Sequence, residues 1–90
     1  MAEQIGYQVV GTVTAVKGNC RWGHKVGDNI ELSAYSPGGL CGFFYHDIFH
    51  YIVLLQFGGD FPKEWGAPDA IVVECTDRLN AVRMELRREK

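Results

Sequence analysis

The chain has 90 residues, of which 47% are hydrophobic and 22% charged, a composition typical of one folded domain over residues 1–90 and not of a disordered chain. Its formal net charge of −2 gives no basic field for a nucleic-acid backbone, so we expect no nucleic-acid partner. The longest apolar run, residues 48–57, is shorter than the about 20 residues that span a bilayer, and the N-terminus lacks a signal-peptide pattern. We therefore expect a cytoplasmic protein without a membrane partner. One alternative to this expectation is a local basic patch formed by Arg83, Arg87, Arg88 and Lys90.

Two strands are expected in the first third of the chain. Residues 7–17 alternate in polarity, which places Val13 and Ala15 on one face and Val16 on the other. After a glycine-rich turn, residues 29–33 have the pattern of a short strand. Gly27-Asp28 is expected to form part of the turn between the two strands, because glycine tolerates positive φ and aspartate bonds nearby amides.

Residues 42–56 have the pattern of a helix, with a buried stripe at helical spacing formed by Phe44, Ile48, Tyr51, Ile52 and Leu55. The segment is apolar nearly all round, and its polar residues are His46, Asp47, His50 and Gln56. A helix of this kind must be covered on more than one side. The sequence therefore predicts a homo-oligomer through helix 43–56, or docking of the helix on a larger protein partner.

The rest of the chain completes an α+β fold. Gly58-Gly59 is expected to end the helix. Residues 70–75 form an apolar strand that we expect at the centre of the sheet, because both of its faces are apolar. Residues 82–87 alternate as a last strand. The order is β-β-α-β-β, an antiparallel sheet of about four strands covered by one aromatic-rich helix.

A glycine-rich turn carries Cys20 and His24, which are residue types of metal sites, of nucleophile–base pairs and of tight turns. Together with Cys41 and Cys75 they make a set of three thiols and one imidazole, which suits zinc or iron. The alternative is that Cys41 and Cys75 are buried core thiols, because free cysteine is among the most buried residue types. An odd cysteine count in a reducing compartment favours free thiols or metal ligands over a disulfide framework.

Two further patterns have a chemical interpretation. Cys41 stands where the helix begins, and the helix dipole there stabilises a thiolate, so a thiol-based enzyme using Cys41 with His24 as base is an alternative function. The helical pair His46 and His50 imitates the zinc-protease motif, but Asp47 is shorter than the glutamate of that motif and no third ligand is apparent. A polar stripe on the helix is the simpler interpretation.

Four motifs occur in a fixed order: Gly18-x-Cys20-x-x-Gly23-His24-Lys25-x-Gly27-Asp28, Gly39-Leu40-Cys41, Leu55-x-x-Gly58-Gly59-x-Phe61-Pro62 and Cys75-x-Asp77. In these the chain resembles a family of small uncharacterised bacterial and archaeal proteins. Where that family tends to have proline after the last two cysteines, this chain has Gly42 and Thr76. The resemblance implies a stand-alone cytoplasmic domain and brings no established activity with it.

Three functions stay open at this point. The first is a small cytoplasmic accessory or binding protein with a metal site at Cys20, His24, Cys41 and Cys75. The second is the thiol-based enzyme, and the third is a structural oligomeric subunit that docks its apolar helix. The sequence specifies no substrate, reaction or catalytic residue.

Overall fold

The computed structural model describes residues 5–18, 23–75 and 81–89. Its elements in chain order are β1 (Gln8–Val16), β2 (Asn29–Leu32), α1 (Gly42–Gln56), the short 3₁₀ helix η1 (Lys63–Trp65), β3 (Ala70–Glu74) and β4 (Val82–Glu89). The predicted helix has the observed bounds, and each expected strand is present within a few residues of its expected position.

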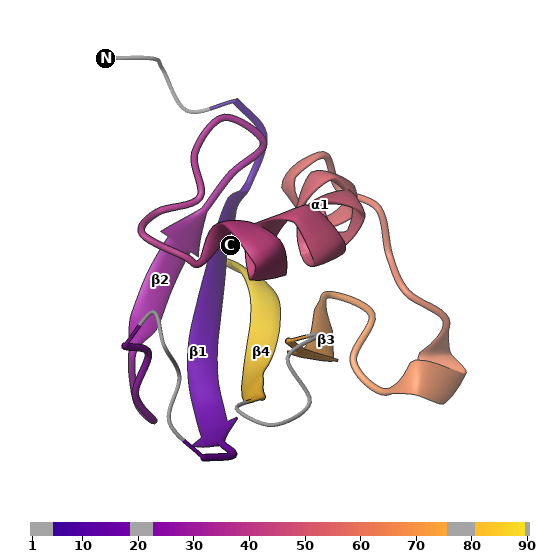
Figure 1. Ribbon diagram of the computed structural model, residues 1–90. Coiled ribbons are helices and arrows are strands. Elements are labelled where there is room, and N and C mark those ends of the chain that lie inside the picture. The colour runs from indigo at the N-terminus through magenta and orange to yellow at the C-terminus, as the bar shows by residue number, and fades with distance from the viewer. Residues whose placement is uncertain (1–4, 19–22, 76–80, 90) are drawn as a thin grey trace.

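The strands form one antiparallel sheet in the order β2-β1-β4-β3, and α1 lies across one face of it (Figure 1). The two longest strands, β1 and β4, pair along the middle of the sheet, with Gln8 opposite Glu89 and Val16 opposite Val82. The predicted α+β fold with a four-stranded antiparallel sheet and one covering helix is confirmed.

The expected central position of the strand at residues 70–75 is wrong, because β3 lies at the sheet edge and pairs with β4. Its two apolar faces meet different environments. Val73 is buried on the face that α1 covers, whereas Val72 on the opposite face is 59% exposed. The inner position next to β3 is occupied by β4. Its outward side chains are charged, which is compatible with an inner strand because the second face of an antiparallel sheet can be solvated.

A β-bulge in β1 changes which side chains face the core. Val13 lies opposite Met84 and Ala15 lies opposite Arg83, so Thr14 is the extra residue of the bulged strand. Beyond the bulge Val16 packs against the core and Ala15 is exposed. The predicted faces of these two residues are therefore wrong, since strict alternation fails where a residue is inserted.

The core lies between the sheet and the inner side of α1. That side contributes four fully or almost fully buried side chains, which are Phe44, Ile48, Ile52 and Leu55. They pack with sheet residues such as Met84 and Leu86, which are 0% exposed. The buried stripe of the helix is thus the one expected from helical spacing, except that Tyr51 at its margin is only half-buried.

The end of α1 is set by two glycines, as expected. Gly58 has φ +88°, which an L-residue rarely adopts, and its N–H donates to the carbonyl of Leu55 at 3.3 Å. The N–H of Gly59 donates to the carbonyl of Leu54 at 2.8 Å. These two bonds form the Schellman motif, which satisfies carbonyls that the helix leaves unpaired.

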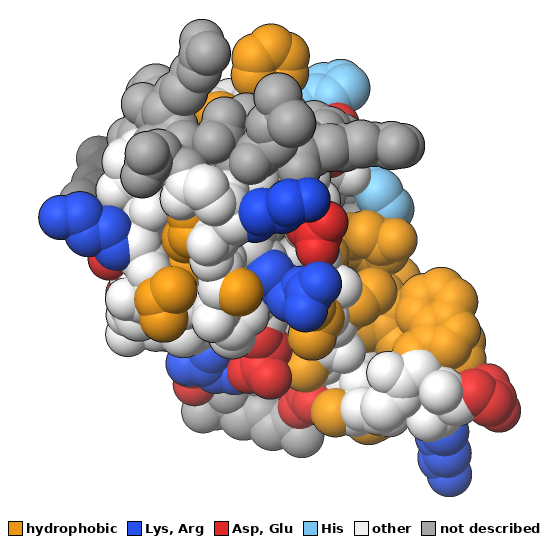
Figure 2. Space-filling view, turned by 60° about the horizontal axis from the view of Figure 1, so that its bottom comes forward, with side chains coloured by type: hydrophobic (Ala, Val, Ile, Leu, Met, Phe, Trp, Pro, Cys, Tyr) orange, Lys and Arg blue, Asp and Glu red, His pale blue; other side chains and the backbone are white. Residues whose placement is uncertain are grey.

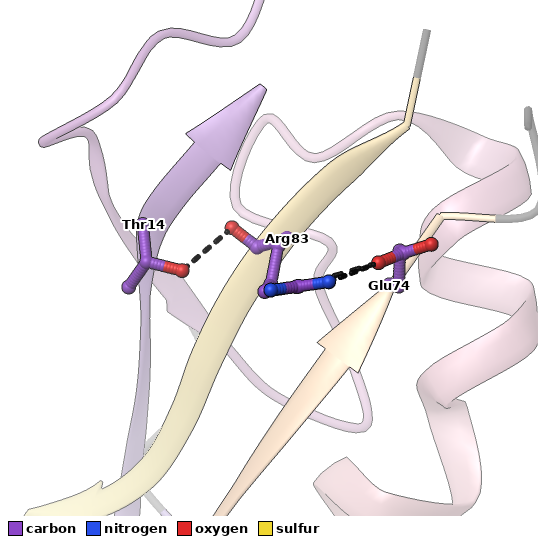
Figure 3. Close-up of polar contacts among 3 residues, drawn as sticks. All are labelled: Thr14, Glu74 and Arg83. Carbon is purple, nitrogen blue, oxygen red and sulfur yellow. Dashed lines mark hydrogen bonds and ion pairs between the residues drawn. The ribbon is translucent and has the colours of Figure 1, made fainter. Parts of the chain in front are cut away.

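The face of the sheet opposite α1 carries charged and hydroxyl side chains. Arg83 of β4 forms an ion pair with Glu74 of β3 at 3.0 Å, and the hydroxyl of Thr14 donates to the carbonyl of Arg83 at 3.3 Å (Figure 3). We call this the open face. Its ion pairs are solvent-exposed, in contrast to the apolar face under α1.

Candidate functional site

The turn that contains His24 is held to β1 by backbone bonds. The N–H of Gly27 donates to the carbonyl of Val13 at 2.8 Å, and the N–H of Val13 donates to the carbonyl of Asp28 at 2.9 Å. Within the turn, the carboxylate of Asp28 accepts from the N–H of Lys25 at 2.9 Å. Gly27 has φ +95°. The expected role of Gly27-Asp28 as a turn is therefore confirmed.

His24 is buried and joins this turn to the start of α1. Its Nε2 accepts a hydrogen bond from the backbone N–H of Cys41, the N-cap residue of α1, at 3.2 Å. This bond gives a partner to one of the amide groups at the helix start. Because the Nε2 lone pair is the acceptor, the neutral imidazole carries its proton on Nδ1. The imidazole of His24 thus has a structural role, since it joins the turn to the helix start.

Burial sets the charge state of His24. Desolvation lowers the pKa of the imidazole below its ordinary value of 6.5, and the negative charge of Asp28 opposes this shift without cancelling it. The neutral form is therefore favoured at pH 7. The neutral form is also the one that accepts from Cys41, since a protonated imidazole has no lone pair on Nε2.

The predicted ligand set is only partly brought together. His24 and Cys41 are neighbours through the hydrogen bond that the backbone N–H of Cys41 donates to the imidazole. Cys75 stands just after β3, where its N–H donates to the carbonyl of Val82 at 2.9 Å and its side chain packs against the core. Cys20 lies outside the described residues. Within the described part of the chain, no three His, Cys, Asp or Glu side chains are placed to hold a metal ion, so the four-ligand site stays a prediction.

The histidine pair on α1 lies on the outer side of the helix. His46 and His50 are both exposed, and the Nδ1 atom of His46 lies 3.6 Å from the carboxylate of Asp47. The other carboxylate oxygen of Asp47, Oδ2, is buried and has no hydrogen-bond partner among the described residues. These three residues are the polar part of the outer side.

The remainder of the outer side is apolar. Phe43 is 78% exposed and Phe57, directly after the helix, is 55% exposed, with Phe49 less so. Trp65 of η1 is also exposed and stacks on Phe61 with ring centroids 6.0 Å apart. Figure 2 shows hydrophobic side chains gathered at the right of the view, the side that carries the end of α1 and η1. Exposed apolar patches of this kind mark interaction surfaces more often than chance.

The structural roles of two residues were not predicted from the sequence. Gln56 is 1% exposed, and its side chain donates to the carbonyl of Ile5 and accepts from the N–H of Ala34, each at 2.8 Å. A polar residue in the last turn of an apolar helix is the signal that points to such a role, but its partners are 51 and 22 residues away.

The second of these residues is Arg88, which had been grouped with the candidate basic patch. Its guanidinium donates to the carbonyls of Leu55 and Gly59 and to the carboxylate of Asp60, at 3.3, 3.0 and 2.7 Å. Its side chain is only 7% exposed. Arg83, on the open face, is paired with Glu74. Arg88 therefore serves the end of α1, where a cation also complements the helix dipole, and does not join Arg83 in one patch.

No helix in the described part of the chain is long and apolar enough to cross a membrane. Comparison with protein-family models, with curated proteins and with solved structures gave no match. The resemblance drawn from the four motifs thus stays a prediction.

Proposed function

We propose that this chain is a small accessory protein that acts by docking the outer side of α1 on another protein surface. The observation that carries the proposal is the exposure of large aromatic side chains on the helix that also builds the core, above all Phe43 at 78%. We also propose the cytoplasmic location that was expected from the sequence.

The charge pattern of α1 supports docking. Among its 15 residues Asp47 alone carries a formal charge. A helix face that remains in water typically carries several charged side chains, which this outer side lacks. Each large apolar side chain that leaves water on binding contributes about 1.5–3 kcal/mol when fully buried. A few aromatic anchors of this type are sufficient to dominate the binding energy of an interface.

The test is photo-crosslinking in cells with p-benzoylphenylalanine at position 43. The matched control carries the same group at Tyr35, which is an exposed aromatic residue of the loop between β2 and α1. We expect a discrete covalent adduct from position 43 and none from position 35. Equal labelling from both positions, or no adduct from either, would contradict docking through α1.

A metal site is the second candidate, and the contact between His24 and Cys41 is what favours it. These two predicted ligands are neighbours, and Cys20 precedes His24 by only four residues in the chain. Thiolate and neutral imidazole are ligands that zinc and iron accept. A neutral imidazole that binds a metal through Nδ1 carries its proton on Nε2, so coordination there would replace the hydrogen bond that Nε2 accepts from the Cys41 N–H.

Metal analysis of untagged protein tests this candidate. If Cys20, His24, Cys41 and Cys75 bind zinc or iron, the purified protein retains a stoichiometric amount that Cys41→Ser loses. Cys75→Ser serves as the comparison, because it removes the predicted ligand that lies after β3. Protein that is metal-free and whose melting is unchanged by added Zn²⁺ would contradict a metal site.

The thiol-enzyme alternative receives no comparable support. A general base must lie within hydrogen-bond reach of the proton that it removes. The Nε2 atom of His24 accepts from the amide of Cys41 and is thereby directed to the backbone rather than to the thiol.

A further inference from the structure

One stripe on the outer side of α1 repeats at intervals of three and four residues. It comprises Phe43, His46, His50, Val53 and Phe57, and we call it the outer seam. Alternating intervals of three and four are the spacing by which two helices pack along each other with interlocking side chains. Four of its members are exposed and Val53 is half-buried. The seam therefore has the spacing of a helix–helix contact but no helix against it among the described residues.

We infer that the surface docked on the outer seam is a second copy of this chain, packed antiparallel with His50 at the two-fold axis. This inference rests on the proposed docking function and names its partner. The two ends of the seam are symmetric about His50, since Phe43 and Phe57 each lie seven residues from it, and between them His46 and Val53 lie four and three residues away. A two-fold contact requires a self-complementary surface of this kind.

The symmetry pairs unlike positions at the ends of the contact. In the antiparallel arrangement, Phe43 of one copy lies level with Phe57 of the other, and the same contact occurs twice. The two aromatic residues are separated by about 21 Å along the helix at 1.5 Å per residue. The pairing thus covers the two most exposed aromatic residues of the seam at both ends.

The single formal charge of α1 also favours the antiparallel arrangement. With His50 on the axis, the two Asp47 residues lie on opposite sides of it and about 9 Å apart along the helix axis. Each Asp47 then lies within one helical turn of His50 of the second copy. A parallel pairing would instead set Asp47 beside Asp47 and bring like charges together.

Position-resolved crosslinking of purified protein tests the pairing. Protein with p-benzoylphenylalanine at position 43 is mixed with ¹⁵N-labelled wild-type protein, irradiated and digested for mass spectrometry. We expect a crosslinked dimer in which p-benzoylphenylalanine at position 43 is bonded to residues 53–57 of the ¹⁵N-labelled copy. A crosslink from position 43 to residues 43–46 of the other copy would show a parallel contact and overturn the inference.

Sedimentation across a concentration series supplies the second measurement. One helix pair buries less surface than most stable interfaces, so we expect dissociation in about the micromolar range. Phe43→Glu should raise the dissociation constant by about tenfold or more, because the substitution enters the two-fold contact twice. The control is Val26→Glu, at an exposed residue in the turn before β2, which should leave dissociation unchanged. Equal far-UV circular dichroism spectra of the two variants show that both are folded, so that a difference in dissociation constant reflects the contact and not unfolding.

The outcomes separate the inference from the function on which it rests. Protein that stays monomeric at about 1 mM, while position 43 still captures a different protein in cells, overturns the second copy and leaves docking through α1 intact. Monomeric protein with no adduct in cells overturns both.

Discussion

The inner and outer sides of α1 are made of similar residues and meet opposite environments. Phe44 is 0% exposed under the helix, whereas its neighbour Phe43 is 78% exposed. The hydrophobicity of the helix therefore shows how much apolar surface needs a cover, and the position of the sheet decides which side receives one. The side that the sheet leaves uncovered is where we place binding.

The sharpest way to test this comparison is to truncate the two adjacent phenylalanines. Phe44→Ala should lower the free energy of unfolding by about 3–5 kcal/mol, because it opens a cavity under the helix. Phe43→Ala should change it by no more than about 0.5 kcal/mol in dilute protein, where each chain is alone. Urea unfolding monitored by circular dichroism measures both values.

The reverse ranking, or a large loss for Phe43→Ala in dilute protein, would mean that Phe43 packs within its own chain. The outer side would then be part of the fold rather than a binding surface. At high protein concentration the same variant should unfold more easily than wild type, since self-association stabilises the folded chain by mass action.

The two faces of the sheet offer a second comparison through their arginines. Arg88→Met should lower the free energy of unfolding by about 2 kcal/mol, because its charged hydrogen bonds to the carbonyls of Leu55 and Gly59 are lost in a buried setting. Part of the loss should appear as fraying at the end of α1, measured as faster amide hydrogen exchange in its last turn. A change below about 0.5 kcal/mol would show that Arg88 does not hold the helix end.

The two ends of α1 differ in how they respond to pH. Arg88 holds the end of α1 by hydrogen bonds, whereas at its start burial lowers the pKa of His24 below 6.5 in the folded chain. The unfolded chain therefore binds more protons between the folded pKa and 6.5. The stabilisation is fully present above pH 6.5 and is lost as pH falls through the folded pKa. Urea unfolding at a series of pH values measures this loss, which we expect to be smaller than that of Arg88→Met.

The matched variants for this prediction are His24→Gln and His46→Gln. Glutamine at position 24 keeps an acceptor for the Cys41 amide and does not titrate, so this part of the pH dependence should vanish. His46 is exposed, and in dilute protein, where each chain is alone, its replacement should leave the loss that depends on His24 in place. If both variants retain the wild-type profile, His24 is not the group responsible.

The helix and the strands were predictable because their signals are local. The apolar stripe of residues 42–56 and the glycines after it lie within one segment, and they set both bounds of α1. The bulge at Thr14 and the edge position of β3 were not predictable, because they depend on which strands pair and in what register. A pattern along one strand carries no information about its neighbours.

The candidate site was predictable only as a list of residues. His24 and Cys41 are 17 positions apart, and their contact arises because the turn before β2 folds back to the start of α1. The sequence indicated chemically capable residue types there, but it did not indicate that the imidazole would accept from an amide. The outer side of α1 was different. Its lack of charge was visible in the sequence and led to the same prediction of association that its exposure now supports.

The smallest effect is expected on the open face of the sheet, where Arg83 is the counterpart of Arg88 on the same strand. Arg83 pairs with Glu74 at 3.0 Å (Figure 3), but both side chains are more than half exposed, at 56% and 52%. Exposed ion pairs contribute about 0–1 kcal/mol because water and salt screen them. Arg83→Met should therefore change the free energy of unfolding by less than about 0.5 kcal/mol, measured beside Arg88→Met in the same buffer. If Arg83→Met lowered the free energy of unfolding as much as Arg88→Met, burial would not explain the different contributions of these two arginines, which lie five residues apart on β4.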